Sequence, residues 1–352
     1  MNELWSDCIR SLEPYRPGEQ PPIGQLIKLN TNENPYPPSP VVLDALRSAA
    51  NDNLRLYPDP EGKALKQTIA DIHGLNQANV FLGNGSDEVL AHTFLALLKH
   101  ELPIYFPDVT YSFYPVYCAL YGIKYQTAPL DDNFQINVED YAQPNGGIVL
   151  ANPNAPTGSA LSLTQLLRLV EHSQGSVVVV DEAYVDFGTE SSVPLVKEFP
   201  NVLVVQTLSK SRSLAGLRVG FAIGDEGLVE ALNLVKNCFN SYPLGRLALA
   251  GAEAALRDRE YFKKTRQQII KCRDWLAEEL ISLGFYVVPS KANFLFVRHA
   301  SYAAKEIQQQ LRQRKIVVRH FPQPRIVEFL RISIGTPEEC KALAKALQEI
   351  LW

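Results

Sequence analysis

The sequence has no long apolar run, no long basic run and few cysteines. None of its 352 residues form a stretch apolar enough to span a bilayer, and the N-terminus carries Glu3 and Asp7 where a secretory signal would carry basic residues. A net charge of −4 without a basic cluster argues against nucleic acid and anionic membranes as partners. These absences leave a small molecule as the expected partner.

The five cysteines are odd in number and widely scattered along the chain. This pattern favours free thiols in a reducing compartment over a disulfide framework or a zinc cluster. We therefore expect a cytoplasmic protein without a bound metal. The sequence also contains no internal repeat and no low-complexity segment.

Length and composition indicate a globular protein with two domains. The chain exceeds the roughly 250–300 residues at which a single core stops growing. Hydrophobic residues make up 46% and charged residues 20%, as in typical soluble domains. The first forty residues are rich in proline and predict an extended arm. We expect this arm over 1–40, a large domain over 41–245 and a small domain over 246–352 that part of the arm joins.

Apolar runs alternate with helical stretches from about residue 64 onward. Continuous β-branched runs between helices indicate a largely parallel sheet covered on both faces, which is an α/β fold. Polar segments at 152–158, 181–184 and 207–210 follow three of the runs, and ligands bind at the carboxyl ends of such strands. After Pro243, long helices and short strands predict an α+β domain. The expected large-domain strands are Val80–Leu82, Pro103–Phe106, Gly147–Ala151, Ser176–Val180 and Val202–Gln206.

The segment from Thr207 to Gly220 carries a lysine directly after an apolar strand and an arginine eight residues later. An amine attacks an aldehyde only when it is unprotonated, and nearby cations and shielding from water disfavour its charged form. Lys210 has the setting of a Schiff-base lysine, and Arg218 suits a phosphate dianion together with nearby hydroxyl groups. A lone lysine after a strand would more often be solvated, so the whole pattern carries this interpretation.

This segment resembles the cofactor-lysine segment of fold type I aminotransferases, and of the histidinol-phosphate aminotransferases in particular. The resemblance covers about residues 10 to 335, with the motifs in family order. It implies pyridoxal 5′-phosphate as cofactor, a Schiff base with Lys210, and Thr207, Ser209 and Arg218 on the cofactor phosphate. It also implies a large domain with a mainly parallel seven-stranded sheet sandwiched between helices, and a smaller α+β domain.

Asp181 and Tyr184 follow the apolar run that ends at Val180. An unpaired carboxylate at the mouth of a buried strand is costly, so Asp181 calls for a cationic partner. A protonated pyridine nitrogen is such a partner, and holding it protonated makes the ring an electron sink. By resemblance, Asp181 holds that nitrogen and Tyr184 reaches the ring's phenolic oxygen. Read alone, the aspartate also fits a helix cap.

Two further segments gain a role only through the resemblance. Gly83–Glu88 alone is an ordinary strand-turn-helix, but amides at a helix start bind phosphate. In the family this turn binds the cofactor phosphate. The resemblance therefore implies that Ser86 and Asp87 bind that phosphate, chiefly through their backbone amides. Tyr111 matches the aromatic residue that stacks on the pyridine ring, although a core tyrosine explains it as well without the other motifs.

One turn departs from the family pattern, and another implies a dimer. Ala155 stands where family members usually carry an asparagine that contacts the phenolic oxygen, so either Asn154 takes over that contact or Tyr184 makes it alone.

Leu56–Asp59 matches a segment whose tyrosine reaches the partner's cofactor phosphate. Tyr57 therefore implies a homodimer with shared active sites, while a surface turn explains the same residues.

Two regions bear on the substrate. Arg331 lies in an apolar strand, and a buried guanidinium calls for an anion. The family binds the substrate anion with this motif, and a phosphate in place of a carboxylate favours a second cation, Arg319 or Arg325. The arm segments 12–15 and 29–35 resemble the arm of histidinol-phosphate aminotransferases, which implies that Tyr15 binds the substrate phosphate and that Asn32 helps to close the site.

The implied enzyme is a transaminase of histidine biosynthesis. It interconverts L-histidinol phosphate and 2-oxoglutarate with imidazole-acetol phosphate and L-glutamate by ping-pong kinetics, and Lys210 moves the proton of the substrate α-carbon. An aromatic amino-acid aminotransferase on the same scaffold is the nearest alternative, followed by threonine-phosphate decarboxylase. A cofactor-binding regulator is a third alternative, but such a protein would usually carry a DNA-binding module, and we recognise none.

Overall fold

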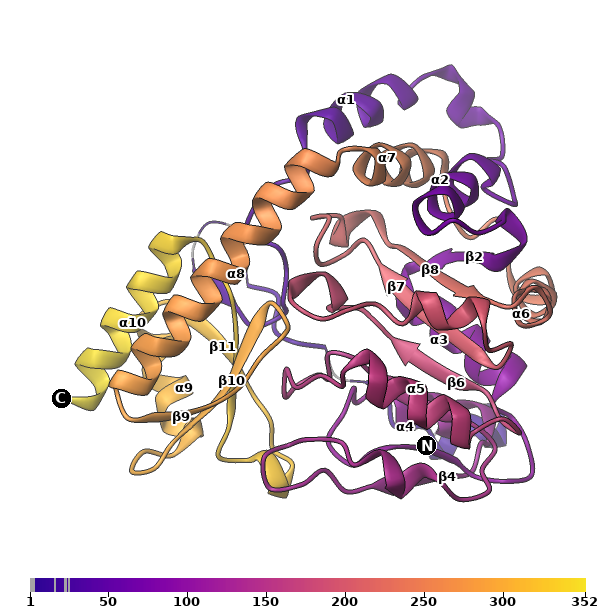
Figure 1. Cartoon of the computed structure of the whole chain (residues 1–352). Helices are drawn as coiled ribbons and strands as arrows, with labels where there is room; N and C mark the ends of the chain where they lie inside the picture. Colours follow the sequence, from indigo (N-terminus) through magenta and orange to yellow (C-terminus); the bar gives the residue numbers. More distant parts are fainter. Residues whose placement is uncertain (1–3, 16, 22–23, 25) are drawn as a thin grey trace.

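The computed structural model describes residues 4–15, 17–21, 24 and 26–352, which form two sheets with helices around them (Figure 1). The larger sheet has seven strands, in the spatial order β2 (Val80–Asn84), β8 (Val219–Gly224), β7 (Val202–Thr207), β6 (Val178–Asp181), β5 (Ile148–Ala151), β3 (Ile104–Pro107) and β4 (Tyr125–Ala128). Neighbouring strands are parallel except at β8, which runs antiparallel to β2 and β7. The predicted mainly parallel seven-stranded sheet is confirmed, and all five expected strands are part of it.

Helices cover both faces of this sheet because its central strands carry apolar side chains on both faces. In β6, Val178 and Val180 pack into one core and Val179 into another, and all three are fully buried. Successive side chains of a strand point to opposite faces, so a continuous valine run requires cover on both. The first core is shared with α1 (Pro40–Ala49), α2 (Lys63–His73), α5 (Leu163–His172) and α7 (Arg246–Arg257), the second with α3 (Gly85–Leu97), α4 (Tyr114–Tyr121) and α6 (Glu226–Phe239).

The smaller sheet has five strands and includes a piece of the N-terminal arm. Its order is β1 (Ile27–Leu29), β11 (Ile316–His320), β12 (Leu330–Ser333), β10 (Phe294–His299) and β9 (Phe285–Val288). β1 pairs in parallel with β11, while the other neighbours are antiparallel. An apolar core joins this sheet to α8 (Arg259–Ser282), α9 (Ala304–Gln313) and α10 (Pro337–Leu351).

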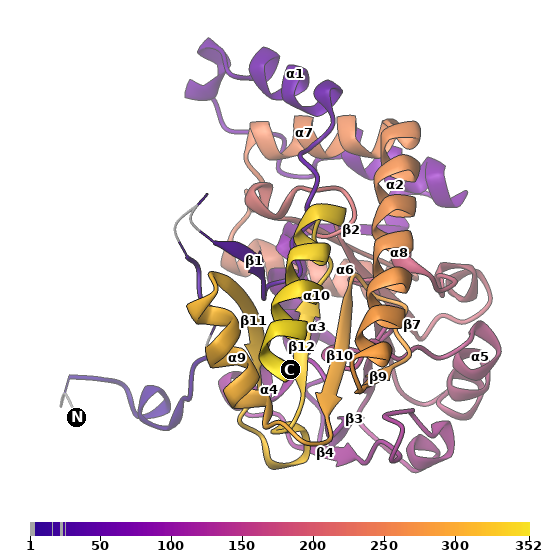
Figure 2. The ribbon, with the colours of Figure 1, turned by 90° about the vertical axis from the view of Figure 1, so that its left-hand side faces the viewer.

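The long helix α8 connects the regions of the two sheets. It leads from α7, which packs against α1 and α2, down to the smaller sheet (Figure 1). The N-terminal segment that contains the short helix η1 (Asp7–Ser11) projects away from the body of the molecule (Figure 2). The predicted domain boundaries at residues 40 and 245 stay predictions.

Candidate active site

The carboxyl ends of β5, β6 and β7 open into a cavity of about 250 Å³ whose walls come from both sheets and from the arm. Parallel strands bring side chains from distant parts of the sequence to one edge of a sheet, which is why the polar segments after these strands meet here. Two of the predicted site residues, Asn154 and Tyr57, do not line the cavity. The predicted residues that line it are Tyr15, Asn32, Ser86, Asp87, Tyr111, Asp181, Tyr184, Thr207, Ser209, Lys210, Arg218, Arg319 and Arg331.

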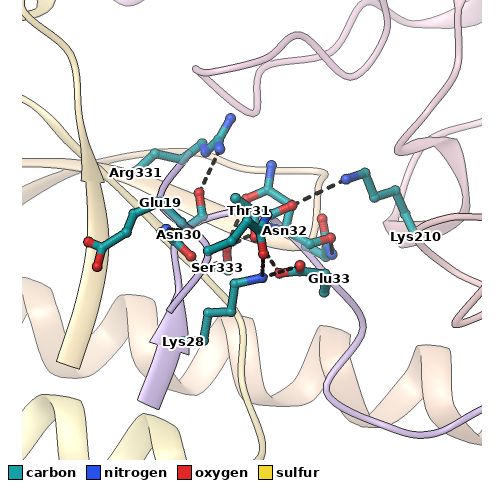
Figure 3. Close-up of polar contacts among 11 residues, drawn as sticks. Glu19, Lys28, Asn30, Thr31, Asn32, Glu33, Lys210, Arg331 and Ser333 are labelled. Atoms are coloured by element: carbon teal, nitrogen blue, oxygen red, sulfur yellow. Dashed lines mark hydrogen bonds and ion pairs between the residues drawn. The ribbon is translucent and has the colours of Figure 1, made fainter. Parts of the chain in front are cut away.

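Lys210 lies just beyond the end of β7, and its amine faces the arm (Figure 3). Its Nζ donates to the main-chain oxygen of Thr31 at 3.2 Å and lies 5.9 Å from the centre of the Tyr184 ring. The side chain of Asn34 donates to the main-chain oxygens of Lys210 at 3.0 Å and Ser211 at 3.2 Å. The arm therefore holds the lysine backbone, and one neutral carbonyl receives its amine.

Asp181 is the last residue of β6 and is only 5% exposed. Its Oδ2 accepts a hydrogen bond from the hydroxyl of Tyr114 at 3.0 Å, and its Oδ1 accepts one from the amide of Ala183 at 3.1 Å. Burial raises the pKa of Asp181 to about 6, although these two hydrogen bonds oppose the rise. No ion pair among the described residues reaches this carboxylate, so its location calls for a cation in the cavity.

Arg218 packs against the turn at which β2 becomes α3. Its Nη2 donates to Asp87 Oδ2 at 2.9 Å. A Cβ on Gly85 would lie 2.4 Å from this Nη2, and a Cβ on Gly220 would lie 2.3 Å from the amide nitrogen of Ser86. Only glycine allows both approaches, which bring a guanidinium close to the first amides of α3. A guanidinium and amides at a helix start together suit a phosphate group.

Two hydroxyl residues and two aromatic residues complete the large-sheet side of the cavity. The Thr207 hydroxyl donates to the Ser209 hydroxyl at 3.0 Å. The Tyr111 hydroxyl donates to Asp87 Oδ1 at 2.9 Å, and burial raises the pKa of Tyr111 well above its usual value, so it remains a donor. The ring of Tyr15 lies 6.3 Å from the ring of Tyr111, which brings the arm over the same wall.

Asn32 on the arm contacts Ser333 of the smaller sheet (Figure 3), and it also contacts Tyr184, which follows β6 of the larger sheet. Its Nδ2 donates to the hydroxyl oxygen of Tyr184 at 3.0 Å. Its Oδ1 accepts from the hydroxyl of Ser333 at 2.9 Å, its main-chain amide donates to the same hydroxyl oxygen at 2.8 Å, and its main-chain oxygen accepts from Asn293 at 3.0 Å. Asn32 is 1% exposed and has a φ of +56°, a left-handed conformation that asparagine tolerates better than most residues.

Two arginines of the smaller sheet face the cavity next to each other. Arg319 and Arg331 are direct neighbours on the antiparallel strands β11 and β12. Arg331 Nη2 donates to the main-chain oxygen of Asn30 at 3.0 Å, while its buried Nε has no hydrogen-bond partner among the described residues. Burial lowers the pKa of Arg331, and the charge of Arg319 adds to this effect. Two close guanidinium groups in a cavity wall call for an anion.

Arg325 is engaged away from this pair. Its guanidinium pairs with the carboxylate of Asp108 and donates to the main-chain oxygens of Leu130 and Asp131, and it does not line the cavity. Of the two candidates for a second cation, the geometry therefore favours Arg319.

Asn154 is buried, and its side chain is bound to the segment that follows β3. Its Nδ2 donates to the main-chain oxygen of Val109 at 2.9 Å, and its Oδ1 accepts from the Thr110 hydroxyl at 2.8 Å. Ala155 lines the cavity instead and packs in an apolar cluster with Phe294 and Tyr184. This arrangement favours the alternative in which Tyr184 alone faces the phenolic oxygen, and the predicted role of Asn154 stays a prediction.

Tyr57 lies on the surface and is 79% exposed. Its ring stacks on Tyr242 at 4.7 Å, and its main-chain oxygen accepts a hydrogen bond from Arg246 at 3.1 Å. Within one chain it is therefore remote from the cavity walls, and its predicted role depends on a partner subunit.

Three residues that hold the predicted ones in position were not predicted from the sequence. Tyr114 contacts Asp181, and Asn293 and Ser333 contact Asn32. Tyr114 had a weak signal, since it follows Tyr111 by three residues and a helix start would bring both side chains to one side. Ser333 is the last residue of β12 and Asn293 directly precedes β10, and neither carried a signal of its own.

The donor chemistry of the cavity fits pyridoxal 5′-phosphate. The cofactor needs an amine, an anion near its ring nitrogen and donors for its phosphate. Lys210 supplies the amine and Asp181 supplies the anion. Arg218 and the amides at the start of α3, which lie close together, supply the donors for the phosphate. Among the described residues no cluster of His, Cys, Asp and Glu is arranged to hold a metal ion, and no helix there has the length and apolar character needed to cross a membrane.

Comparison with known proteins gives a consistent family. Residues 24–347 match the family model described as aminotransferase class I and II. The chain is 58% identical to histidinol-phosphate aminotransferase 1 of Methylococcus capsulatus over 351 residues, which cover 100% of this chain and 98% of that protein. It is also 58% identical to histidinol-phosphate aminotransferase of Aromatoleum aromaticum over 355 residues, with 100% of both chains covered.

A solved structure agrees with this result. The crystal structure of histidinol-phosphate aminotransferase from Sinorhizobium meliloti in complex with pyridoxal-5′-phosphate has a TM-score of 0.88 and 26% identity, covering 100% of this chain and 98% of that one. The fold predicted from the resemblance is confirmed. The chain belongs to the class I and II aminotransferases and, within them, to the histidinol-phosphate aminotransferase family.

Proposed function

We propose that this protein transfers an amino group from L-histidinol phosphate to 2-oxoglutarate, giving imidazole-acetol phosphate and L-glutamate, with pyridoxal 5′-phosphate as its cofactor. One observation carries the proposal: Arg319 and Arg331, which are direct neighbours on β11 and β12, line the same cavity as Lys210 and Asp181. A cavity with an amine, a buried carboxylate and a pair of cations suits an amino donor that carries a phosphate.

The cofactor supplies an electron sink for the carbanion that forms at the substrate α-carbon. Asp181 holds the proton of its ring nitrogen, which a buried carboxylate does well because no other cation among the described residues pairs with it. Tyr184 would donate to the phenolic oxygen, and Arg218 would hold the cofactor phosphate together with Thr207, Ser209 and the amides of Ser86 and Asp87. Tyr111 would pack against the ring.

Lys210 acts as the proton carrier. Once its amine is free, Nζ would take the proton from the substrate α-carbon, hold it as an ammonium ion and deliver it to the C4′ carbon of the cofactor. Within the part of the chain that the structure describes, Nζ donates only to the neutral Thr31 carbonyl, at 3.2 Å. Because this contact is not an ion pair, the amine can leave it at a small energetic cost.

The substrate phosphate binds between Arg319 and Arg331, with Tyr15 and Asn32 of the arm closing the cavity over it. Histidinol phosphate has no carboxylate, so its phosphate is the anionic group that it offers to the two arginines. The buried, unpartnered Nε of Arg331 is a donor ready for this anion.

We further propose a homodimer in the cytoplasm whose active sites are shared. Tyr57 and Tyr242 expose aromatic surface, and apolar residues near them in the sequence are exposed as well. A surface of this kind favours contact with a second copy of the chain, which would bring Tyr57 to the partner's cofactor phosphate. The exposed neighbours in sequence are Leu54, Leu56, Leu234 and Phe239.

A steady-state assay of the cofactor-loaded protein tests the reaction. Histidinol phosphate, dephosphorylated histidinol and phenylalanine are compared as amino donors to 2-oxoglutarate, and Lys210→Ala is the control. Parallel double-reciprocal lines and a preference for histidinol phosphate over histidinol are expected. A preference for phenylalanine would assign the chain to aromatic amino acids, release of CO2 from threonine phosphate would assign it to decarboxylation, and turnover by Lys210→Ala would refute the lysine mechanism.

A further inference from the structure

Tyr114 is a fully buried tyrosine whose hydroxyl group reaches the carboxylate of Asp181. It is the first residue of α4, and its hydroxyl lies 3.0 Å from Oδ2. The ring packs against Phe94 at 5.9 Å, Phe106 at 5.8 Å and Tyr111 at 5.6 Å. A ring packed on several sides has one available orientation, so the hydroxyl is held against Oδ2.

The neighbouring tyrosines do not share this contact. Tyr111 donates to Asp87 Oδ1, and Tyr117 donates to the main-chain oxygen of Asp87 at 2.9 Å. Tyr114 itself does not line the cavity. Tyr114 touches two residues that line the cavity, Tyr111 through its ring and Asp181 through its hydroxyl, and Tyr114→Phe keeps the ring contact while it removes the hydrogen bond to Asp181.

We propose that Tyr114 is a positioning residue that keeps Asp181 ionised, so that the proton shared with the cofactor's ring nitrogen stays on the ring. This inference rests on the proposed function, because it needs pyridoxal phosphate bound at Asp181. A hydrogen bond donated to a carboxylate stabilises its ionised form and makes it a weaker base. When a carboxylate and a pyridine share one proton, a weaker carboxylate base leaves the proton on the nitrogen. Without the tyrosine hydroxyl the proton moves toward Asp181, and a neutral ring withdraws electrons less strongly.

The charges around Asp181 explain why such a donor is needed. Burial raises the pKa of Asp181, and the nearby carboxylates of Asp87 and Glu182 raise it further. Among the described residues, only the Tyr114 hydroxyl and the amide of Ala183 donate hydrogen bonds to its carboxylate, and both lower that pKa. Burial and Asp181 itself raise the pKa of Tyr114 well above its usual value, so the tyrosine remains a donor.

The test reads the proton directly. Cofactor labelled with ¹⁵N in the ring is loaded into the wild-type protein and into Tyr114→Phe, and the ¹⁵N chemical shift is measured without substrate. We expect the protonated frequency in the wild type and a displacement toward the unprotonated frequency in the variant. The kcat should fall roughly tenfold with little change in KM, which corresponds to about one unit in the basicity of Asp181. An unmoved ¹⁵N signal in Tyr114→Phe would overturn the inference.

Two reference variants separate this inference from the proposed function. Tyr117→Phe removes a hydroxyl from the same helix without touching the Asp181 carboxylate and should leave the ¹⁵N signal in place. Asp181→Asn gives the frequency of an unprotonated ring; if it leaves the signal unmoved, the proposed cofactor orientation fails and the inference fails with it. Turnover by Lys210→Ala would refute the proposed lysine chemistry while the ¹⁵N result stands.

A second substitution covers the case in which Tyr114→Phe does not fold. Site-specific replacement of Tyr114 by 3-fluorotyrosine keeps the hydroxyl and makes it a stronger donor. The ¹⁵N signal should then persist at the protonated frequency to higher pH than in the wild type. A pH profile identical to that of the wild type would contradict the inference.

Discussion

Asn32 donates a hydrogen bond to the hydroxyl oxygen of Tyr184 at 3.0 Å, although the two residues lie on the arm and on the large-sheet side of the cavity. Because this oxygen accepts from Asn32, the hydroxyl proton of Tyr184 points elsewhere, toward the cavity that the side chain lines. Ser333 on β12 holds Asn32 through its side chain and its main-chain amide. The smaller sheet, through Ser333 and Asn32, thereby orients the side chain of Tyr184, which follows strand β6 of the larger sheet.

Replacing Asn32 by glycine tests this relationship. Glycine keeps the positive φ of the backbone without strain and removes the side-chain amide. We expect the kcat to fall roughly tenfold as Tyr184 loses its orientation, and the free energy of unfolding to fall by about 1–3 kcal/mol because Ser333 loses a buried partner. Steady-state kinetics and thermal unfolding measure the two effects.

A double-mutant cycle shows whether Asn32 acts through Tyr184. If it does, the double variant Asn32→Gly/Tyr184→Phe has the same kcat as Tyr184→Phe alone. The reason is that Tyr184→Phe has already removed the hydroxyl group that Asn32 orients. Multiplying losses would mean that Asn32 acts on the substrate independently of Tyr184.

Substituting Arg331 by glutamine should raise the KM for the phosphate-bearing donor by roughly 10- to 100-fold, because a charge-assisted contact to phosphate is lost. Arg325→Gln is the matched control, since Arg325 pairs with Asp108 outside the cavity lining and its loss should leave this KM nearly unchanged. Initial-rate kinetics with histidinol phosphate distinguish the two. Equal effects of both substitutions would show that the phosphate does not bind at the cavity arginines.

Asp181 makes the cofactor-free protein less stable as the pH rises. Its pKa is about 6 in the fold and roughly 3.9 in an unfolded chain, so the folded state binds the proton more tightly. The stability that protonation gives is complete below about pH 4 and is lost as the pH rises toward 6, a difference of about 3 kcal/mol. Asp181→Asn should therefore raise the thermal midpoint at pH 8 more than at pH 4. Exposed Asp132→Asn serves as the control, and a pH-independent gain in Asp181→Asn would contradict this origin.

The sequence predicted the central strands because buried parallel strands are continuous apolar runs, as in Val178–Asp181. It did not predict β4, since three of its four residues are exposed and it has no such run. It also missed β8, which begins directly after Arg218 in a segment interpreted only for its chemistry. The antiparallel direction of β8 depends on pairing with β2 and β7, which local sequence does not encode.

The residues of the candidate site also fall into those that local sequence predicts and those that depend on distant contacts. Lys210, Asp181 and Arg218 were predictable because each follows or precedes a strand in a motif with its own chemical logic. Tyr114, Asn293 and Ser333 were not, because their importance lies in contacts with distant residues, such as the 301 positions that separate Asn32 from Ser333. Tyr57 is a third case, since its predicted role requires a second subunit.

Replacing Gly220 by alanine tests the close packing of this glycine against Gly85 and Ser86 beside Arg218. A Cβ at this position would lie 2.3 Å from the Ser86 amide nitrogen and 2.4 Å from the Gly85 carbonyl carbon, both of which are main-chain atoms that cannot rotate aside. Gly220→Ala should push the first turn of α3 away from Arg218, lower the free energy of unfolding by about 1–3 kcal/mol and weaken cofactor binding roughly tenfold. Gly216→Ala is the matched control, because its Cβ would meet nothing within 4 Å. Fluorescence titration with pyridoxal phosphate measures the affinity; an unchanged Kd in a destabilised Gly220→Ala protein would mean that the amides of this turn do not hold the cofactor phosphate.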